Sequence, residues 1–332
     1  MNYLLSLPYV KVVLPYIMLV IGFIFLIKGA DFFVDGSASI AKKLKIPDII
    51  IGLTVVAMGT SMPELVVSAS SALKGNSDIA IGNVVGSNLL NVLIILGLSA
   101  IIVPLCVDKS MFKRDIPVLL LTAVTVPAIA IAYKLTVGKY MIGRVGGIIL
   151  AILFIGYIVM NVKAALDYRK KNAGVDDGEE IKESSWWKSI LFTVGGAALI
   201  IVGGDLSVDG AVAIAKQLGI SEAVIGLTVI ALGTSLPELV TSVVAAKKGS
   251  SDIALGNIVG SNIFNALLIL GTTAIIKPIA VPFKSVIDLM ILLGVSIYLA
   301  ITARTGKKIS RLEGATYVAF YAIYLTYLFI SM

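Results

Sequence analysis

The chain has 332 residues, of which 58% are hydrophobic and 14% are charged, and its mean hydropathy is +1.01. This composition excludes a water-soluble domain and indicates an integral membrane protein. The net charge of +7 fits Lys and Arg retained in cytoplasmic loops better than a nucleic-acid surface. The single cysteine, Cys106, excludes an internal disulfide, and the lack of histidine removes the commonest transition-metal ligand.

Ten apolar segments are long enough to span a bilayer as helices, and the period-2 alternation of an outer-membrane barrel is missing. Five segments precede the polar stretch 167–188 and five follow it. The sequence therefore predicts an all-α membrane protein with ten transmembrane helices. The segments cover residues 13–41, 48–73, 78–103, 115–133, 141–164, 189–215, 221–246, 252–276, 285–303 and 312–331.

The second half of the chain repeats the first. Residues 52–91 and 226–265 align without a gap and are identical at most positions, and GADFFVDG (29–36) matches GGDLSVDG (203–210). Because each half has an odd number of spans, the second half enters the membrane from the opposite side, so the halves are predicted to be inverted repeats. The predicted units are a first five-helix repeat (1–166), a cytoplasmic linker (167–188) and a second, inverted five-helix repeat (189–332).

Charge predicts the orientation of the chain. Most Lys and Arg fall on connections that face the cytoplasm if the N-terminus lies outside. Both termini are therefore predicted to be extracytoplasmic, with the protein in the plasma membrane and its first apolar segment retained as a span. The linker has an acidic run, Asp176, Asp177, Glu179 and Glu180, which lacks the ligand spacing of an EF-hand loop and is interpreted as solvated.

The first and sixth predicted helices each contain two aspartates four residues apart, on one helix face: Asp31 with Asp35, and Asp205 with Asp209. Such pairs could relay ions. The favoured interpretation places them at the aqueous end of a long helix, where they contact loop backbone or, in the first copy, Lys28.

The motif GTSMPE (59–64) is predicted to break its helix. Pro63 has no N–H for the carbonyl of Gly59, and its ring crowds the preceding turn. Carbonyl oxygens between about Ala57 and Thr60 should then be free, which membrane depth tolerates only where protein, water or an ion satisfies them. Glu64 shares a helix face with Thr60 and Ser61.

The oxygen atoms of the two copies form the candidate site. Two carboxylates, two carboxamides, hydroxyls and carbonyls suit a hard cation, and a flexible cage suits Ca²⁺ better than Mg²⁺. Na⁺ is close in size, so the two ions could occupy one pocket in turn, which is the physical basis of exchange. The candidate metal ligands are Ala57, Thr60, Ser61, Glu64, Ser87 and Asn91, with Ala231, Thr234, Ser235, Glu238, Ser261 and Asn265.

Structural roles are the alternative for these residues. A buried Glu can be a protonated structural residue, and small residues often serve helix packing. For Glu64 and Glu238, each beside a proline in a repeated motif, the functional interpretation is preferred. Structural roles are preferred for three other groups. Asn83, Asn88, Asn257 and Asn262 are predicted to bond loosened backbone, Gly82, Gly86, Gly256 and Gly260 to allow close packing, and Asp78 and Asp252 to be N-caps.

The paired segments GTSMPE and GTSLPE, followed by GNVVGSNLLN and GNIVGSNIFN, resemble the two α-repeats of the Ca²⁺:cation antiporter superfamily, in its prokaryotic Na⁺/Ca²⁺ exchanger branch. The resemblance implies a core of eight helices across which the first and sixth helices slide to alternate access. It also implies a central Ca²⁺ held by Glu64, Glu238 and the carbonyls of Thr60 and Thr234. Sodium positions would use Ala57, Ser61 and Ser87 with Ala231, Ser235 and Ser261, and Asn91 would line the middle.

Two departures from the family pattern narrow the function. Asn265 stands where potassium-dependent and some other exchangers carry Asp, which disfavours K⁺ dependence, and the linker is too short for large regulatory domains. The proton-coupled branch tends to place an acidic residue in the GN motif, which here reads GNVVGSN, so Na⁺ coupling is favoured.

The sequence thus predicts a secondary antiporter, not an enzyme, that moves Na⁺ inward and Ca²⁺ outward. The alternative is H⁺/Ca²⁺ exchange through the same glutamates, and an ion channel or an intramembrane hydrolase is disfavoured. The expected partners are the two transported ions and the bilayer, without a cofactor, nucleic acid or obligatory protein partner.

Overall fold

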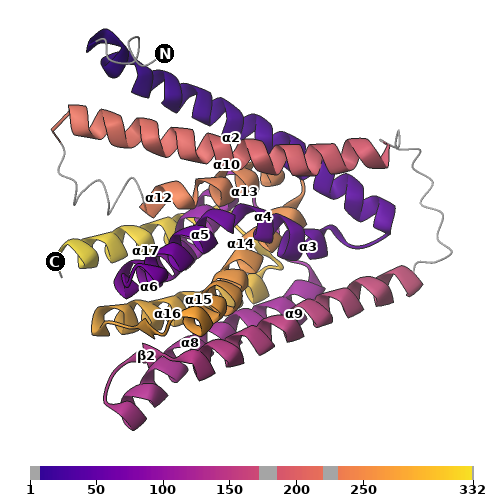
Figure 1. The fold of residues 1–332 in the computed structure, drawn as a ribbon. Helices are drawn as coiled ribbons and strands as arrows, with labels where there is room; N and C mark the ends of the chain where they lie inside the picture. Colours follow the sequence, from indigo (N-terminus) through magenta and orange to yellow (C-terminus); the bar gives the residue numbers. More distant parts are fainter. Residues whose placement is uncertain (1–7, 172–184, 220–230, 331–332) are drawn as a thin grey trace.

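The computed structural model describes residues 8–171, 185–219 and 231–330, and it is almost entirely helical (Figure 1). The linker's acidic run, both chain ends and the start of the predicted segment 221–246 lie outside the described residues. The first half contains α2 (Pro8–Leu44), α3 (Asp48–Ile51), π-helix η1 (Gly52–Val56), α4 (Ala57–Thr60), α5 (Met62–Leu73), α6 (Ser77–Leu90), π-helix η2 (Asn91–Ile95), α7 (Leu96–Ile102), β1 (Leu105–Cys106), π-helix η3 (Met111–Asp115), α8 (Ile116–Val137), β2 (Met141–Ile142) and α9 (Arg144–Lys171).

The second half follows the same order of elements where it is described. It contains α10 (Trp186–Gln217), α12 (Ala231–Thr234), α13 (Leu236–Lys247), α14 (Ser251–Phe264), π-helix η5 (Asn265–Ile269), α15 (Leu270–Ile276), β3 (Ile279–Ala280), α16 (Phe283–Thr305), β4 (Lys308–Ile309) and α17 (Arg311–Ile330).

Each of the ten predicted segments overlaps a helix of the described chain. Seven helices are long and apolar enough to cross a membrane, and an eighth span results if the bent pair Asp48–Thr60 and Met62–Leu73 is counted as one. The segments 221–246 and 312–331 correspond to α12 with α13 and to α17, which are not among these eight. The protein is thus an all-helical, multi-pass membrane protein with four two-residue strands that the sequence did not predict.

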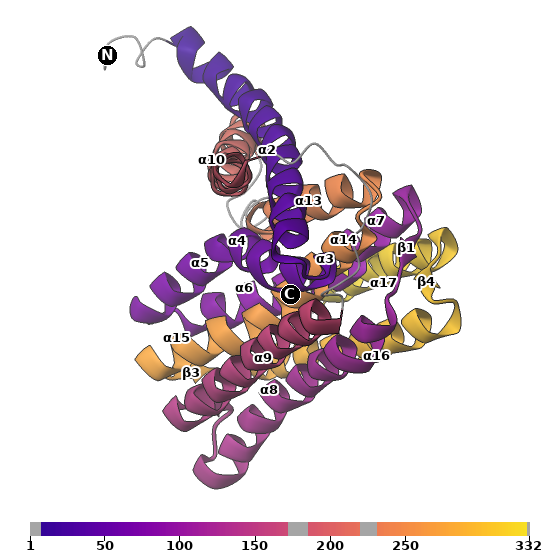
Figure 2. The same ribbon diagram turned by 90° about the vertical axis from the view of Figure 1, so that its right-hand side faces the viewer.

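The helices α2 and α10 form a layer of their own. They pack along each other on one side of the remaining helices (Figures 1 and 2). Glycines allow this close approach: a Cβ on Gly203 would lie 2.7 Å from the main-chain nitrogen of Leu26, and one on Gly29 would lie 2.9 Å from the carbonyl oxygen of Gly196. Apolar side chains such as Val20 on α2 and Leu191 on α10 remain exposed, as expected for lipid-facing surface.

The other helices form a bundle with two spans at its centre. In their most apolar 18-residue stretches, 94% of the residues of Ser251–Ile276 and 72% of those of Ser77–Ile102 are buried, whereas the other five of the seven long helices in the described chain reach at most 44%. The central helix α14 lies against η1, where a Cβ on Gly256 would be 2.9 Å from the Cα of Gly52. These two central spans carry the predicted Ser87, Asn91, Ser261 and Asn265, so the candidate site lies in the middle of the bundle.

Two short strand pairs join the halves. In antiparallel register, Leu105 of β1 pairs with Ile309 of β4, and Met141 of β2 pairs with Ala280 of β3. Each pair takes one strand from each half. β1 and β3 follow corresponding helices, α7 and α15, and they pair with β4 and β2, which also correspond to each other.

Both predicted N-caps are wrong. The N-cap of α6 is Asn76 and that of α14 is Ser250, so Asp78 and Asp252 lie inside the first turn of their helices. A short polar residue two positions earlier already provides the non-helical N-cap backbone, with ψ 68° at Asn76 and ψ 64° at Ser250. An acidic side chain in the first turn still interacts favourably with the positive end of the helix dipole.

Candidate functional site

The helix breaks at Ser61, as the proline predicts. The axis bends by 48° between the helix pieces Asp48–Thr60 and Met62–Leu73, with Ser61 at φ −85° and ψ 9° and Pro63 in the first turn of α5. Ser235 has nearly the same backbone, φ −94° and ψ 5°, before Pro237. Within the described part of the chain, no hydrogen bond reaches the carbonyl oxygens of Gly59 and Thr60.

The prediction that the carbonyl of Ala57 is free was wrong. It accepts the N–H of Ser61 at 3.0 Å and the hydroxyl of Thr60 at 3.3 Å, because the helix continues for one more turn before the proline takes effect. An ion at this oxygen would have to displace the Thr60 hydroxyl. Its counterpart Ala231 begins α12, and the surroundings of that side chain lie outside the described residues.

The two glutamates are completely buried and are held across the two halves. Both side chains are 0% exposed. Ser61 donates its hydroxyl to Glu238 Oε1 at 2.8 Å, and Ser235 donates to Glu64 Oε1 at 3.3 Å. Ser87 also donates to Glu64 Oε1, at 3.2 Å. Each serine of a GTS motif therefore binds the glutamate of the other motif, which brings both carboxylates into one polar site.

Several oxygens of this site have no hydrogen-bond donor in the described structure. Among the described residues, five buried oxygens of the predicted ligands lack any hydrogen-bond partner: Glu64 Oε2, Glu238 Oε2, Asn91 Oδ1, Asn265 Oδ1 and Ser261 Oγ. Four of them form two equivalent pairs from the two halves. A buried polar atom without a partner is costly, and a cluster of such acceptors calls for an unaccounted cation, proton or water.

Two asparagines and two threonines make a second crossed set of hydrogen bonds next to the glutamates. Asn83 donates Nδ2 to the carbonyl of Glu64 at 3.3 Å and Asn257 donates to that of Glu238 at 3.3 Å. Thr60 donates its hydroxyl to Asn257 Oδ1 at 2.9 Å, and Thr234 makes the equivalent bond to Asn83 at 3.5 Å. The predicted role of these two asparagines, bonding backbone beside the break, is confirmed.

This set of hydrogen bonds also includes two serines that the sequence analysis missed. Ser68 accepts from Asn83 Nδ2 at 3.0 Å, and Ser242 accepts from Asn257 Nδ2 at 2.9 Å. Each serine lies four residues after its glutamate and is identical in both copies of the repeat. That spacing, read together with the identity, was the signal that could have identified them.

Close packing by the repeated glycines is confirmed in the second copy. A Cβ on Gly256 would meet Gly52, and one on Gly260 would lie 2.8 Å from the carbonyl oxygen of Leu53. Gly82 and Gly86 have no such neighbour among the described residues; the counterparts of Gly52 and Leu53 lie in the range 220–230, outside those residues.

The arrangement can bind a hard cation without any soft ligand. No group of three or more His, Cys, Asp or Glu side chains occurs among the described residues, so the acceptors beside the two carboxylates are neutral. Carboxylate, carboxamide, hydroxyl and main-chain oxygens are the ligands of Ca²⁺ and Na⁺ and are unsuited to zinc or copper.

The chain is similar to proteins named as antiporters and exchangers. The family model described as sodium/calcium exchanger protein matches residues 14–163 and 188–330. A putative antiporter, CaxA, from Alkalimonas amylolytica is 38% identical over 307 residues, covering 89% of this chain and 92% of that protein. The sodium/calcium exchanger MaX1 from Methanosarcina acetivorans is 34% identical over 322 residues, with 88% and 92% covered.

The fold leads to the same family. The sodium-calcium exchanger NCX_Mj, in a crystal soaked with 10 mM Na⁺ and zero Ca²⁺, matches with a TM-score of 0.82 and 35% identity over 95% of this chain and 99% of that one. The resemblance inferred from the repeated motifs is thereby confirmed. The chain belongs to the sodium/calcium exchanger protein family, in the prokaryotic branch of the Ca²⁺:cation antiporters.

Proposed function

We propose that this antiporter moves Na⁺ into the cell and Ca²⁺ out of it, with Glu64 and Glu238 as ligands shared by both ions. The observation that carries the proposal is the pair of fully buried carboxylates, each with one oxygen bonded by a serine of the other half and the other oxygen without a hydrogen-bond partner in the described chain.

Charge and ligand type favour Ca²⁺ as the divalent substrate. Two carboxylates balance the charge of one Ca²⁺. Asn91, Asn265 and Ser261 supply three further buried oxygens, and the carbonyls of Thr60 and Thr234 complete the proposed ligand set. Six to eight oxygens in a flexible arrangement suit Ca²⁺, whereas Mg²⁺ requires a strict octahedron and keeps its waters. Ser61, Ser87, Ser235 and Ser261, with the carbonyls of Ala57 and Ala231, are the proposed sodium ligands.

A difference in ion pairing between the two halves supports alternating access. Lys248 follows α13 and binds α2 through Asp35 Oδ1 at 2.7 Å and Asp31 Oδ1 at 3.4 Å. The residues at equivalent positions are Lys74, Asp209 and Asp205, and no ion pair joins them in the described structure. α13 packs against α2, whereas their equivalents α5 and α10 do not pack in this way. The favoured interpretation of the aspartates was contact with loop backbone or, in the first copy, with Lys28. Lys28 Nζ lies 3.9 Å from Asp31 Oδ2, while the contact to the end of α13 is made by the Lys248 side chain and not by loop backbone.

The strand pairs support the predicted topology of ten spans in two inverted repeats, 1–166 and 189–332. β1 and β4 lie in connections predicted to be cytoplasmic, β3 lies in a connection predicted to be outside, and β2 lies at the predicted outer end of the segment 141–164, so each pair joins parts assigned to one side. A two-fold axis in the membrane plane would exchange the two pairs. Both termini would then be extracytoplasmic and the linker 167–188 cytoplasmic, with the protein in the plasma membrane.

Calcium uptake into proteoliposomes tests the function. Purified protein is reconstituted, and ⁴⁵Ca²⁺ uptake is measured with an outward Na⁺ gradient, with a pH gradient of matched size and with neither gradient. We expect uptake only with the Na⁺ gradient. Uptake that ignores Na⁺ and follows the pH gradient would establish H⁺/Ca²⁺ exchange instead, which the two buried glutamates could also perform by carrying protons. Flux without any counter-ion would indicate a channel.

A further inference from the structure

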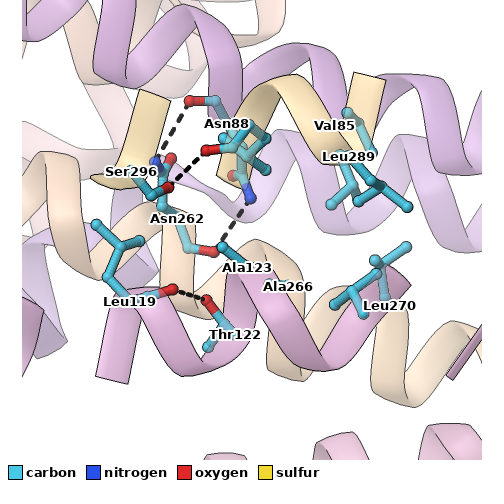
Figure 3. A pocket seen from close by; sticks show the side chains of 13 residues that line it. Val85, Asn88, Leu119, Thr122, Ala123, Asn262, Ala266, Leu270, Leu289 and Ser296 are labelled. Carbon is cyan, nitrogen blue, oxygen red and sulfur yellow. Dashed lines mark hydrogen bonds between the residues drawn. The ribbon is translucent and has the colours of Figure 1, made fainter. Parts of the chain in front are cut away.

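Four asparagines link the two halves in a crossed network next to the candidate ion site. Asn88 donates Nδ2 to the main-chain carbonyl of Asn262 at 3.2 Å, and Asn262 donates Nδ2 to the main-chain carbonyl of Asn88 at 3.3 Å. A main-chain carbonyl can only accept. The NH₂ group of each side chain must therefore face the opposite helix, and its Oδ1 must point away from that carbonyl (Figure 3).

These two fixed oxygens then orient a second pair of amides. Asn91 donates Nδ2 to Asn262 Oδ1 at 3.0 Å, and Asn265 donates Nδ2 to Asn88 Oδ1 at 3.0 Å. With their NH₂ groups engaged, Asn91 and Asn265 can present only oxygen to the other side. Both Oδ1 atoms are buried and have no hydrogen-bond partner in the described structure.

The two asparagines with free oxygens lie one helical turn after serines of the candidate site. Asn91 follows Ser87 by one helical turn, with its N–H bonded to the Ser87 carbonyl, and Ser87 donates to Glu64 at 3.2 Å. Asn265 stands in the same relation to Ser261. A π-helix begins at each of these asparagines, and such wide turns often occur at functional sites.

The surface behind the network offers no competing donor among the described residues. Asn88 and Asn262 border a small, largely apolar cavity between α6, α14, α8 and α16, lined by residues such as Leu119, Ala266 and Leu289 (Figure 3). Its two hydroxyls are engaged on their own helices: Thr122 donates to the carbonyl of Leu119 at 2.7 Å, and Ser296 donates to that of Leu292 at 2.7 Å. The cavity therefore leaves both amides in the orientation set by the main chain.

We propose that Asn88 and Asn262 are positioning residues that fix the amide orientation of Asn265 and Asn91, so that each half of the protein aims the neutral ligand of the other half at the transported cation. This inference rests on the proposed function. An asparagine without a fixed orientation would present N–H donors to the cation in one of its two flips, and those repel a cation. The network removes that flip without touching the ion.

A double-mutant cycle on Ca²⁺ affinity tests the proposal. Binding of ⁴⁵Ca²⁺ to the purified full-length protein is measured for Asn262→Leu alone, in the Asn91→Ala background and in the Asn265→Ala background. We expect Asn262→Leu to weaken binding at least about tenfold alone and in Asn265→Ala, and less than about threefold in Asn91→Ala, where the amide that it orients is already gone. The main-chain carbonyl at position 262 is kept in this variant and would still hold Asn88, so Asn265 is the matched control.

The mirror-image cycle gives a second, independent test. Asn88→Leu should couple to Asn265→Ala and be additive with Asn91→Ala. Thermal unfolding is recorded for every variant, because a purely structural role would lower the unfolding temperature and leave the affinity of the folded protein unchanged. Equal losses in both backgrounds, or unchanged affinity in a folded single variant, would overturn the proposal. Unchanged affinity in Glu238→Gln would instead count against the ion site itself.

Discussion

The change Glu238→Gln removes one charge from the candidate site and leaves its shape intact. Gln is isosteric with Glu, and its Oε1 can still accept the Ser61 hydroxyl that lies 2.8 Å from the present carboxylate oxygen. The main chain at position 238 still accepts Nδ2 of Asn257. We therefore expect the variant to fold with an unfolding temperature close to that of the parent protein.

The effect on Ca²⁺ binding should be large because the charge is fully buried. Glu238 is 0% exposed, so water does not screen its attraction to a cation. Removing one member of a buried charge pair typically costs about 3–5 kcal/mol, and Ca²⁺ affinity should fall by about two to four orders of magnitude, since each factor of ten is about 1.4 kcal/mol. Glu64→Gln should behave in the same way.

The measurement is Ca²⁺ binding by isothermal titration, with ⁴⁵Ca²⁺ uptake by proteoliposomes in parallel. Asp288→Asn is the matched control: Asp288 is a half-buried acid on α16 that accepts the Tyr324 hydroxyl at 3.3 Å, outside the site. It should keep parental affinity and transport. Parental Ca²⁺ affinity in either glutamine variant would refute the role given to the two carboxylates.

Three further predictions concern the two states, the helix seam and the charge of the site. Two cysteine pairs in a Cys106→Ser background test the two access states: Lys248→Cys with Asp35→Cys, and Lys74→Cys with Asp209→Cys. Each pair should form a disulfide under oxidation and reversibly stop Ca²⁺ uptake. If the second pair never cross-links during turnover, alternating access is contradicted. Gly203→Ala should destabilise the α2–α10 layer by about 1–3 kcal/mol through overpacking, because the new Cβ would lie 2.7 Å from the Leu26 nitrogen. The control in thermal unfolding is Gly195→Ala, since no described atom lies within 4 Å of that Cβ position. In Asn265→Asp, Ca²⁺ uptake should fall more steeply with rising pH than in the parent protein. Asn88 Oδ1 needs a hydrogen-bond donor at position 265, and an aspartic acid can donate only while it is protonated. An unchanged pH profile would show that this hydrogen bond does not matter for transport.

The repeated motif was sufficient to predict that the two glutamates share one polar site. Two gapless copies, each with a glutamate beside a proline, imply equivalent backbone, and a common polar site satisfies two ionised acids at membrane depth better than two separate apolar positions. The prediction that Asn83 and Asn257 bond main chain followed from the same reasoning. Composition and apolar periodicity were enough for the helical membrane class.

The pairing across the halves could not be predicted. Spacing within one copy shows that Ser61 and Glu64 share a face, but whether Ser61 binds its own glutamate or Glu238 depends on how two distant segments pack. The errors at Ala57, Asp78 and Asp252 have a related cause. Hydrogen-bond register at a helix break or a helix start is decided by single residues, and a sequence pattern locates such points only to within one or two positions.

The symmetry of the site and the asymmetry around it have different consequences for transport. The crossed bonds of Ser61 and Ser235 tie both carboxylates to both halves, so neither glutamate can follow one half alone, and the pocket should stay assembled while its access changes. The Lys248 bridge to α2 is partly exposed, with a side-chain exposure of 29% for Lys248 and 56% for Asp35, and an exposed ion pair contributes at most about 1 kcal/mol. An ion pair this weak shifts the balance between the two access states without fixing the protein in either one. An equivalent set of residues lies at the other end of the α2–α10 layer. Small differences in ion binding are then enough to shift the population, as a reversible exchanger requires.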